Sequence, residues 1–393
     1  MHETGLIFSI FLIFTGAAIL STVALVTRQS LLVAYILLGM ILGPWGMKLV
    51  SDSAFIHTIG DVGIIFLLFL LGLHLPPQKL LHTLKEVSWI AFISSFLFAW
   101  IGYTAGSLSG YNPTECMIIG AAMMFSSTII GIKLLPTTIL HHQHTGHMMI
   151  SILLLQDLLA IVVLLLMHGM SVAEGMSVNV IENLKLVLFG LPLILLFAFL
   201  IEHFVLMKLL RRFNRIREYA FLLSIAWCLS MSQLSIYFGL SAEIGAFIAG
   251  VTLATSSISL YIAESLKPVR DFFLVMFFFS VGANLNLEYL KEVIVAALFL
   301  ALILLIIKPI IFRLLLKQVS ESKEMSWEIG FRLGQMSEFS LIIAYVALNA
   351  GLIGVSASNL IKTATILSFI ASSYFVVIKY PTPVALSDAM RRD

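Results

Sequence analysis

The chain has 393 residues, of which 60% are hydrophobic and only 11% are charged. Soluble domains carry about 25% charged residues, so this composition excludes a soluble globular protein and indicates a membrane protein. Neither of the two cysteines, Cys116 and Cys228, belongs to a pattern that predicts a disulfide or a metal site. The sequence has no phosphate-binding loop and no nucleophile motif, so we expect neither an enzyme nor a nucleic-acid-binding protein.

Apolar runs follow one another along the whole chain, and each is long enough to cross a bilayer. A transmembrane helix needs about 20 apolar residues to span about 30 Å of hydrocarbon. We predict thirteen such helices, near residues 5–26, 31–50, 60–75, 88–110, 115–135, 149–168, 183–207, 218–237, 241–258, 269–284, 292–316, 327–350 and 357–379. None of them alternates with the period of two typical of a transmembrane β-strand. The predicted fold is therefore an all-α membrane protein, with a transmembrane domain over 1–380.

Lys and Arg are distributed unevenly between the predicted loops. If the N-terminus lies outside, the inside loops hold most of these residues, including the cluster at 211–217. The outside loops hold only Lys48, Lys185, Lys291 and Lys362. The positive-inside rule therefore predicts an outside N-terminus and a short cytoplasmic tail over 381–393. The N-terminus lacks the basic region of a cleavable signal peptide, so we expect the first helix to remain.

Two segments that lie 210 residues apart resemble each other. FLLGLHLPPQKL at 69–80 and FSVGANLNLEYL at 279–290 share a Phe, a Gly and two Leu residues. This similarity pairs the third predicted helix with the tenth, and an odd shift reverses the direction across the membrane. The sequence thus predicts two inverted six-helix repeats, about 5–168 and 218–379, around a linker helix at about 183–207. Inverted repeats are an architecture of secondary transporters, although leucine-rich helices can also resemble one another by chance.

The same offset aligns polar residues in the middle of two predicted helices, near 115–135 and 327–350. The first helix contains Ser126, Ser127 and Thr128, and the second contains Ser337 and Glu338. Interruptions at corresponding positions predict broken helices, which expose main-chain carbonyls and half-helix ends to ions. The alternative is that Ser and Thr bond to the main chain within an intact helix.

An acidic residue lies at the centre of another strongly apolar helix. The sequence LLLQDLLA at 153–160 contains Gln156 and Asp157. A charged Asp at this depth costs roughly 2.5–3.5 kcal/mol on insertion scales, so it needs a partner or a function. Asp157 can hold either a proton or a cation, and the two compete because cation binding needs the deprotonated carboxylate. This competition is sufficient for cation–proton exchange, with the carbonyl of Gln156 as a further ligand; the alternative is an Asp merely bonded to a neighbouring helix.

Other charged residues lie within or near the predicted helices. Lys308 is the natural counter-charge for Asp157, unless it extends to the cytoplasmic interface. Glu338, in the second interruption, is expected to be paired or functional, and Arg332 is a candidate partner. Two further acids near the outer helix ends, Asp61 and Glu243, fit ordinary interfacial positions better than an ion path.

Seven motifs are spread over nearly the whole chain. They are LLGMILGPWG (37–46), GDVGIIFLLFLLGLHL (60–75), FSSTII (125–130), LLLQDLLAI (153–161), LSAEIGAFIAGVTLA (240–254), FFFSVGANL (277–285) and GQMSEFSLI (334–342). Together they resemble the Kef-type branch of the monovalent cation–proton antiporters. The resemblance implies an antiporter fold of the plasma (inner) membrane, with two crossed broken helices in a core domain. It also implies a separate dimerisation domain, a homodimer and an elevator-like movement of the core.

The resemblance also implies roles for individual residues. Carried over by position, Asp157 binds the proton and the cation (K⁺ or Na⁺), with Gln156 beside it. The first helix break then holds Ser126, Ser127 and Thr128, and the second holds Gln335, Ser337 and Glu338. The Gln-Asp pair is similar to the potassium-preferring branch, in which exchange is expected to be electroneutral. No cofactor is expected, since the ions are the substrates.

The sequence departs from the Kef pattern in two places. Kef proteins carry a cytoplasmic nucleotide-binding domain after the last helix, whereas no GxGxxG motif follows a strand here. We therefore expect Kef-type ligand gating to be absent unless a further regulatory domain or subunit supplies it. The loop HHQHTGH contains His141, His142, His144 and His147, which fit a metal-binding or pH-sensing loop or simply a solvated one.

Three other functions remain open for the sequence. They are a channel-like cation efflux pathway, a sodium-coupled solute carrier on a similar scaffold, and a membrane sensor without transport. A channel would need a pore lined by several acids or by rings of carbonyls, and the sequence indicates neither.

Overall fold

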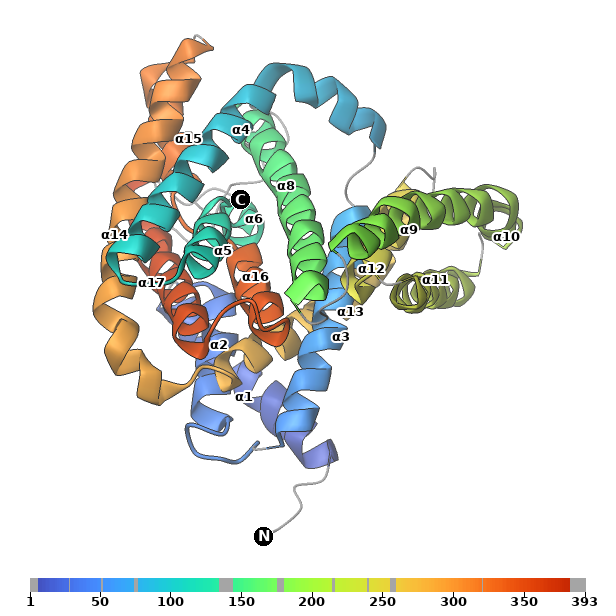
Figure 1. Ribbon diagram of the computed structural model, residues 1–393, viewed down its shortest axis with the longest axis horizontal. Coiled ribbons are helices and arrows are strands. Elements are labelled where there is room, and N and C mark those ends of the chain that lie inside the picture. Colours follow the sequence, from blue (N-terminus) through green and yellow to red (C-terminus); the bar gives the residue numbers. More distant parts are fainter. Residues whose placement is uncertain are drawn as a thin grey trace. The chain divides into compact units, whose positions relative to one another are not determined.

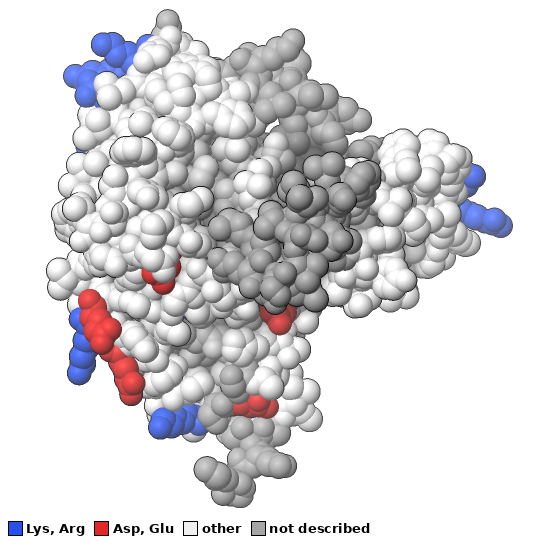
Figure 2. Space-filling model, viewed as in Figure 1, with Lys and Arg blue, Asp and Glu red and all other residues white. Residues whose placement is uncertain are grey.

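The computed structural model describes residues 6–27, 29–50, 52–73, 77–133, 144–174, 180–213, 216–238, 240–254, 259–319 and 321–381. All regular elements in these ranges are helices (Figure 1), as the sequence predicts. Eight of the described helices are long and apolar enough to cross a membrane, and four more are shorter and apolar. In the view of Figure 2, the charged side chains of the described residues are few and form small groups near the edges of a largely uncharged surface. The protein is therefore a multi-pass, all-helical membrane protein.

The chain forms two compact units, which are described separately. The first unit comprises Met1–Asp52, Thr83–Val163 and Val281–Asp393, and the second comprises Ser53–His82 and Leu164–Ser280. Each unit thus contains segments from both of the predicted repeats. Three of the described helices, α4 (Pro77–Leu108), α8 (His144–Glu174) and α13 (Ser259–Ala283), continue from one unit into the other.

The first unit is built around helix α17, which is buried along most of its length. Its helices are α1 (Leu6–Val26), α2 (Leu31–Leu42), most of α4, α5 (Pro113–Met123), α6 (Thr128–Lys133), the first part of α8, α14 (Leu287–Gln318), α15 (Lys323–Arg332), α16 (Glu338–Asn349) and α17 (Val355–Lys379). Helix α17 packs along α14 and α16 and also contacts α5, α15 and α2. Caps fix where several of these helices begin, since Asn112, Asn286 and Ser322 each accept a main-chain N–H of the first turn.

The second unit has an apolar core between α3 and the helices that follow α8. Its helices are α3 (Ser53–Leu73), α9 (Val180–Ile201), the π-helical turn η1 (Glu202–Leu206), α10 (Met207–Arg212), α11 (Arg217–Tyr237), α12 (Ala242–Ala254) and most of α13 (Ser259–Ala283). Helix α12 packs against both α3 and α11. The rings of Phe66 and Phe273 stack with their centroids 4.2 Å apart, and Ser280 Oγ donates to the carbonyl of Ile56 at 2.9 Å. These contacts join α13 to α3.

Helices α3 and α12 cross where two glycines leave room for direct contact between their main chains. A Cβ added at Gly250 would collide with the carbonyl oxygen of Phe69 and would lie 3.0 Å from the Cα of Gly72. A Cβ added at Gly72 would in turn lie 2.9 Å from the main-chain nitrogen of Val251. The atoms that would have to move are main-chain atoms, so any side chain at either position must separate the two helices.

We expect Gly250→Ala to destabilise the second unit, by about 1–3 kcal/mol, which is typical of overpacking. The measurement is the midpoint of thermal unfolding of the purified protein in detergent. Gly131→Ala is the control, because its added Cβ would come no closer than 3.6 Å to a neighbouring atom. Equal unfolding midpoints for the two variants would contradict the close crossing of α3 and α12.

Candidate ion-binding site

The helix predicted near 115–135 is interrupted in the structure at its polar residues. Helix α5 ends at Met123, the main chain leaves the helical path, and α6 begins at Thr128. The freed main-chain groups are met by side chains: Ser126 N–H donates to Gln156 Oε1 at 3.0 Å, and Ser127 Oγ accepts Ile130 N–H at 3.1 Å. Polar main-chain groups at membrane depth need such partners because no bulk water is available to them.

The helix predicted near 327–350 is interrupted in a similar way. Helix α15 ends at Arg332, and α16 begins at Glu338 after a non-helical segment. Ser337 caps α16, since its Oγ accepts Phe339 N–H at 3.1 Å, while Ser340 Oγ accepts Ser337 N–H at 3.3 Å. Helix α17 supplies two further partners: Ser368 Oγ accepts Met336 N–H at 3.1 Å, and Ser372 Oγ donates to Gln335 Oε1 at 3.0 Å.

The two interruptions are in direct contact within the first unit. Ser126 Oγ donates to the carbonyl of Leu333 at 2.7 Å, and Gln335 Nε2 donates to the carbonyl of Ser127 at 3.4 Å. A third bond joins α16 to the end of α5, where Ser340 Oγ donates to the carbonyl of Ala122 at 2.5 Å. Ser127 and Gln335, which are 208 residues apart in the sequence, are thus in contact. The repeat offset in the sequence aligns the two polar segments to which they belong.

Asp157 lies at this centre, on α8, and is fully buried. The hydroxyl of Thr128, at the start of α6, is 3.1 Å from each carboxylate oxygen and donates to the carboxylate. The buried carboxyl group of Glu338 is near enough for its charge to act on that of Asp157. Among the described residues, no cation forms an ion pair with Asp157. A buried carboxylate with one neutral donor and a nearby acid is poorly compensated, so it favours taking up a proton or a cation.

Lys308 is fully buried on α14, but its position differs from the expected one beside Asp157. Its ammonium donates to the carbonyls of Phe125, at 2.6 Å, and Gln335, at 3.2 Å, and lies 4.8 Å from the ring centre of Phe98. Both carbonyls lie just beyond the C-terminal ends of interrupted helices, where the helix dipole places partial negative charge. Within the described residues, Lys308 is thus the counter-charge of the two helix breaks and forms no ion pair with Asp157.

The sequence predicts the carbonyl of Gln156 as an ion ligand, whereas in the structure its amide group bonds to main-chain groups. Its Oε1 accepts Ser126 N–H, as described above, and its Nε2 lies 3.5 Å from the carbonyl of Met124. Both ends of the amide are therefore directed at the break between α5 and α6. The adjacent residues Gln156 and Asp157 have separate tasks, since one holds the break and the other presents a carboxylate. The side chains of Asp157 and Thr128 bring three oxygen atoms together here, and hard cations prefer oxygen ligands.

Arg332 pairs with an acid on its own helix. Its Nε donates to Glu328 Oε1 at 2.9 Å, and one of its terminal nitrogens donates to the carbonyl of Pro381 at 2.8 Å. The pair anchors α15 to the segment that follows α17. Tyr380 lies beside this pair, and its burial together with the charge of Glu328 raises the pKa of the phenol to about 12, so it stays neutral.

The assignment of Lys362 to an outside loop is wrong, because this residue is fully buried in α17. Its ammonium has no hydrogen-bond partner among the described residues. The sequence carries a signal for this burial, because the polar residues Ser358, Asn359 and Thr363 lie close to Lys362 in an otherwise apolar helix.

The remaining candidate residues lie elsewhere. Asp61 on α3 and Glu243 on α12 belong to the second unit, whereas the site is formed within the first. His141 and His142 lie outside the described residues. His144 and His147 belong to the first turns of α8, but their side chains are likewise outside the described part.

The chain is similar to known transport proteins over most of its length. The family model for the transmembrane part of sodium/hydrogen exchangers matches residues 10–378. K(+) efflux antiporter 4 from Arabidopsis thaliana is 28% identical over 353 residues, which are 88% of this chain and 59% of that protein. Glutathione-regulated potassium-efflux system protein KefC from Escherichia coli is 27% identical, over 93% of this chain and 59% of that protein. The chain thus spans about three fifths of the length of these relatives.

The fold also matches that of a solved structure. The sodium proton antiporter of Methanocaldococcus jannaschii superposes with a TM-score of 0.63, covering 94% of this chain and 96% of that one. The sequences are 15% identical, so this comparison establishes a shared fold.

Lys308 and Lys362, which are both buried in the first unit, should respond differently to the loss of their charge. Lys308→Met leaves two carbonyls without a donor, and each such buried group costs about 1–3 kcal/mol. We therefore expect a clear decrease in the midpoint of thermal unfolding in detergent.

Lys362→Met is the matched control, since it removes the same charge from an equally buried position without taking a donor from any described group. Its unfolding midpoint should equal or exceed that of the wild type, because an unpaired buried ammonium is itself costly. A decrease as large as that of Lys308→Met would show that the contacts of Lys308 are not what stabilises the breaks.

Proposed function

Because the chain belongs to the sodium/hydrogen exchanger family of transmembrane transporters, we propose that it exchanges a monovalent cation for a proton at Asp157. The family consists of cation–proton antiporters rather than enzymes, and the transported ions are substrates rather than cofactors. The observation that carries the proposal is the position of Asp157, which is fully buried beside two helix breaks that contact each other. Among the described residues, the hydroxyl of Thr128 is its one hydrogen-bond donor.

The exchange follows from the competition of two ions for one carboxylate. The protonated form of Asp157 is neutral, and so is the form that holds a monovalent cation. The empty, charged form lacks compensation and is the unfavourable one to carry across a low-dielectric barrier. Alternating access therefore moves Asp157 loaded with either ion, and the two fluxes are coupled without a further device.

The residues around Asp157 then have distinct roles. Thr128 orients the carboxylate, and Glu338 contributes oxygen atoms from the start of α16, where the helix dipole favours its negative charge. Ser126, Ser127, Gln335 and Ser337 hold the two breaks in shape, as does Gln156. Lys308 supplies a fixed positive charge that does not depend on which ion is bound.

We propose K⁺ as the preferred cation, with one proton exchanged for each cation. The support for K⁺ is the Gln156–Asp157 pair, which matches the potassium-preferring branch, and the potassium-efflux names of two relatives. The support for electroneutral exchange is that a single carboxylate holds either one proton or one monovalent cation. Lys308 bonds to main-chain carbonyls, so it need not exchange a proton with the substrate.

The wider architecture is proposed on the same grounds. It comprises thirteen membrane segments over residues 1–380, with inverted repeats at about 5–168 and 218–379 around a linker at about 183–207. The support is the offset between the two interrupted helices, α5–α6 and α15–α16, together with the shared antiporter fold. We further propose a homodimer in the plasma (inner) membrane, with the N-terminus outside and the C-terminus in the cytoplasm. Regulation by an additional cytoplasmic domain or subunit is compatible with the greater length of the relatives.

Asp157→Asn should abolish exchange, because an amide cannot alternate between binding a proton and binding a cation. The measurement uses proteoliposomes with an internal pH dye, to which K⁺ or Na⁺ is added outside. Wild-type protein should respond to the cation with a change of internal pH, and the variant should give the signal of empty liposomes.

Glu292→Gln is the matched control, since it removes an exposed carboxylate elsewhere on the first unit and should leave the flux unchanged. Retention of wild-type flux by Asp157→Asn would refute the mechanism and would make Glu338 the next carboxylate to test. A cation flux that persists without any proton movement would instead favour a channel-like pathway.

Electroneutral exchange predicts no net charge movement during turnover. A K⁺ concentration jump on a solid-supported membrane should give no transient current, although the pH dye reports full exchange in the same proteoliposomes. K⁺ should also reach half-saturation at a lower concentration than Na⁺. A current that scales with the dye signal would contradict the one-for-one stoichiometry.

A further inference from the structure

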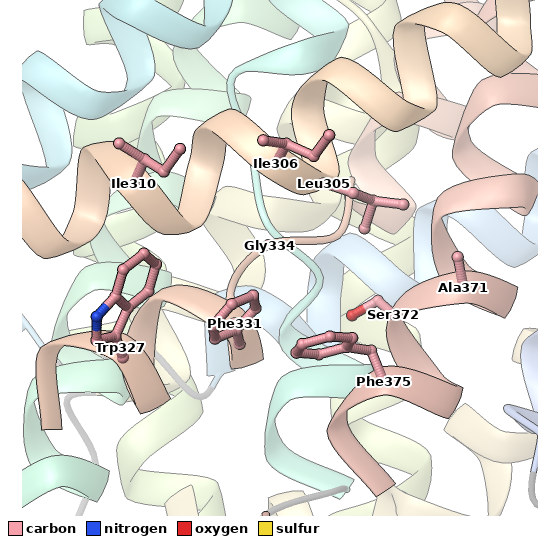
Figure 3. Close-up of a pocket in the computed structure, with 9 residues that line it drawn as sticks. All are labelled: Leu305, Ile306, Ile310, Trp327, Phe331, Gly334, Ala371, Ser372 and Phe375. Atoms are coloured by element: carbon pink, nitrogen blue, oxygen red, sulfur yellow. The ribbon is translucent and has the colours of Figure 1, made fainter. Parts of the chain in front are cut away.

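An apolar groove of about 380 Å³ opens between α14, α15 and α17 (Figure 3), and Asp157 is not part of its lining. Its walls are formed by Leu305, Ile306 and Ile310 of α14, Trp327 and Phe331 of α15, and Phe375 of α17. Two of these large apolar side chains remain accessible, since Ile306 is 57% exposed and Phe375 is 42% exposed. In a membrane protein such a surface meets lipid, so the groove has the chemistry of a seat for a hydrocarbon chain.

The groove has a polar end and an apolar end because of the helical periodicity of its walls. On α14, Arg313 follows Ile310 by three residues, and on α17, Lys379 follows Phe375 by four, so each cation continues the same helix face. The distance from Leu305 to Arg313 along α14 is about 12 Å at 1.5 Å per residue. This length is close to the thickness of one leaflet, which is about half of the 30 Å hydrocarbon core.

Both cations are placed over the aromatic rings of the groove. The guanidinium carbon of Arg313 lies 4.6 Å from the ring centre of Trp327. The ammonium of Lys379 lies 4.7 Å from the ring centre of Phe331 and 5.4 Å from that of Phe375. Within the described residues, neither cation forms an ion pair with an acid. Their charges are therefore available to an anion at this end of the groove.

The acids nearby do not cancel this positive charge. Glu328 is already paired with Arg332, at 2.8 Å. Lys323 and Glu324, in the first turn of α15, are adjacent and of opposite sign. Counting the described residues, the two cations over the aromatic rings thus leave this end of the groove with an excess of positive charge.

The other end of the groove reaches the second helix break. Gly334 lies in the non-helical segment between α15 and α16 and forms part of the lining, as does Ser372. The hydroxyl of Ser372 already donates to Gln335, so it is not available as a donor to a ligand. An occupant must therefore be apolar here and anionic at the opposite end.

We propose that the groove binds an anionic phospholipid, with one acyl chain between α14 and α17 and the phosphate held by Arg313 and Lys379. A zwitterionic lipid fits less well, because its own cationic group would lie beside these two cations. A free phosphate or a soluble anion would leave the aromatic part of the groove unfilled. The proposal concerns binding alone, so it stands or falls independently of the exchange reaction at Asp157.

The test measures how many phospholipid molecules the purified protein retains in detergent, by native mass spectrometry. Phosphatidylglycerol and phosphatidylcholine with identical acyl chains are compared. Wild-type protein should retain phosphatidylglycerol preferentially, and the double variant Arg313→Gln/Lys379→Gln should lose that preference. Each cation near an anionic lipid changes its binding by about fivefold, so the effect of the double variant should be large. Lys291→Gln, on the exposed opposite end of α14, is the matched control and should bind as the wild type does.

A second pair of variants tests the acyl-chain part of the groove. Ala371→Trp introduces a large ring into the lining and should reduce retention of phosphatidylglycerol, while Leu302→Trp adds the same ring at an exposed position of α14 outside the groove. Thermal unfolding establishes that each variant is folded, and Ile306→Trp replaces Ala371→Trp if that variant is not. Equal retention of the two lipids by wild type would overturn the proposal, as would full retention by the double variant or by the groove-filling variant.

Discussion

The structure of the first unit depends on satisfying the main-chain groups that two interrupted helices expose in the interior of a membrane protein. A helix that ends in the hydrocarbon region leaves carbonyls at one side of the break and N–H groups at the other, and each is costly without a partner. The charge of Lys308 is placed on carbonyls from both breaks, at Phe125 and Gln335. One side chain thus compensates both negative helix ends and ties the two breaks together.

Most of the polar side chains at the centre bond to the main-chain groups of the two breaks. Asp157 differs from them, because it forms no such bond in the described structure. Gln156, Ser126 and Ser337 are all bonded to main-chain groups of the breaks. Within the described part of the chain, Asp157 has the hydroxyl of Thr128 as its one donor, so it keeps the capacity to bind a further positive species. The side chains that hold the two breaks are thus distinct from the carboxylate that is left to bind an ion.

Much of this site is predictable from the sequence, because its chemistry depends on residue types that are unusual at membrane depth. Asp157 stands out as a central acid, and the polar residues near Ser127 and Ser337 stand out by their common offset. The partners of Lys308 are not predictable in this way, since they are main-chain carbonyls that any residue could provide. The burial of Lys362 was missed for a related reason: a lysine near a helix end is normally assigned to the interface, and only the packing of α17 against α14 and α16 shows otherwise.

The second break has two environments, and this arrangement constrains how the first unit can move. On one side, Gln335 and Ser337 belong to the network around Asp157, while on the other Gly334 lines an apolar groove between α14 and α17. A change in the break that alters access to Asp157 must also alter the wall of that groove, since the same short segment of main chain forms both.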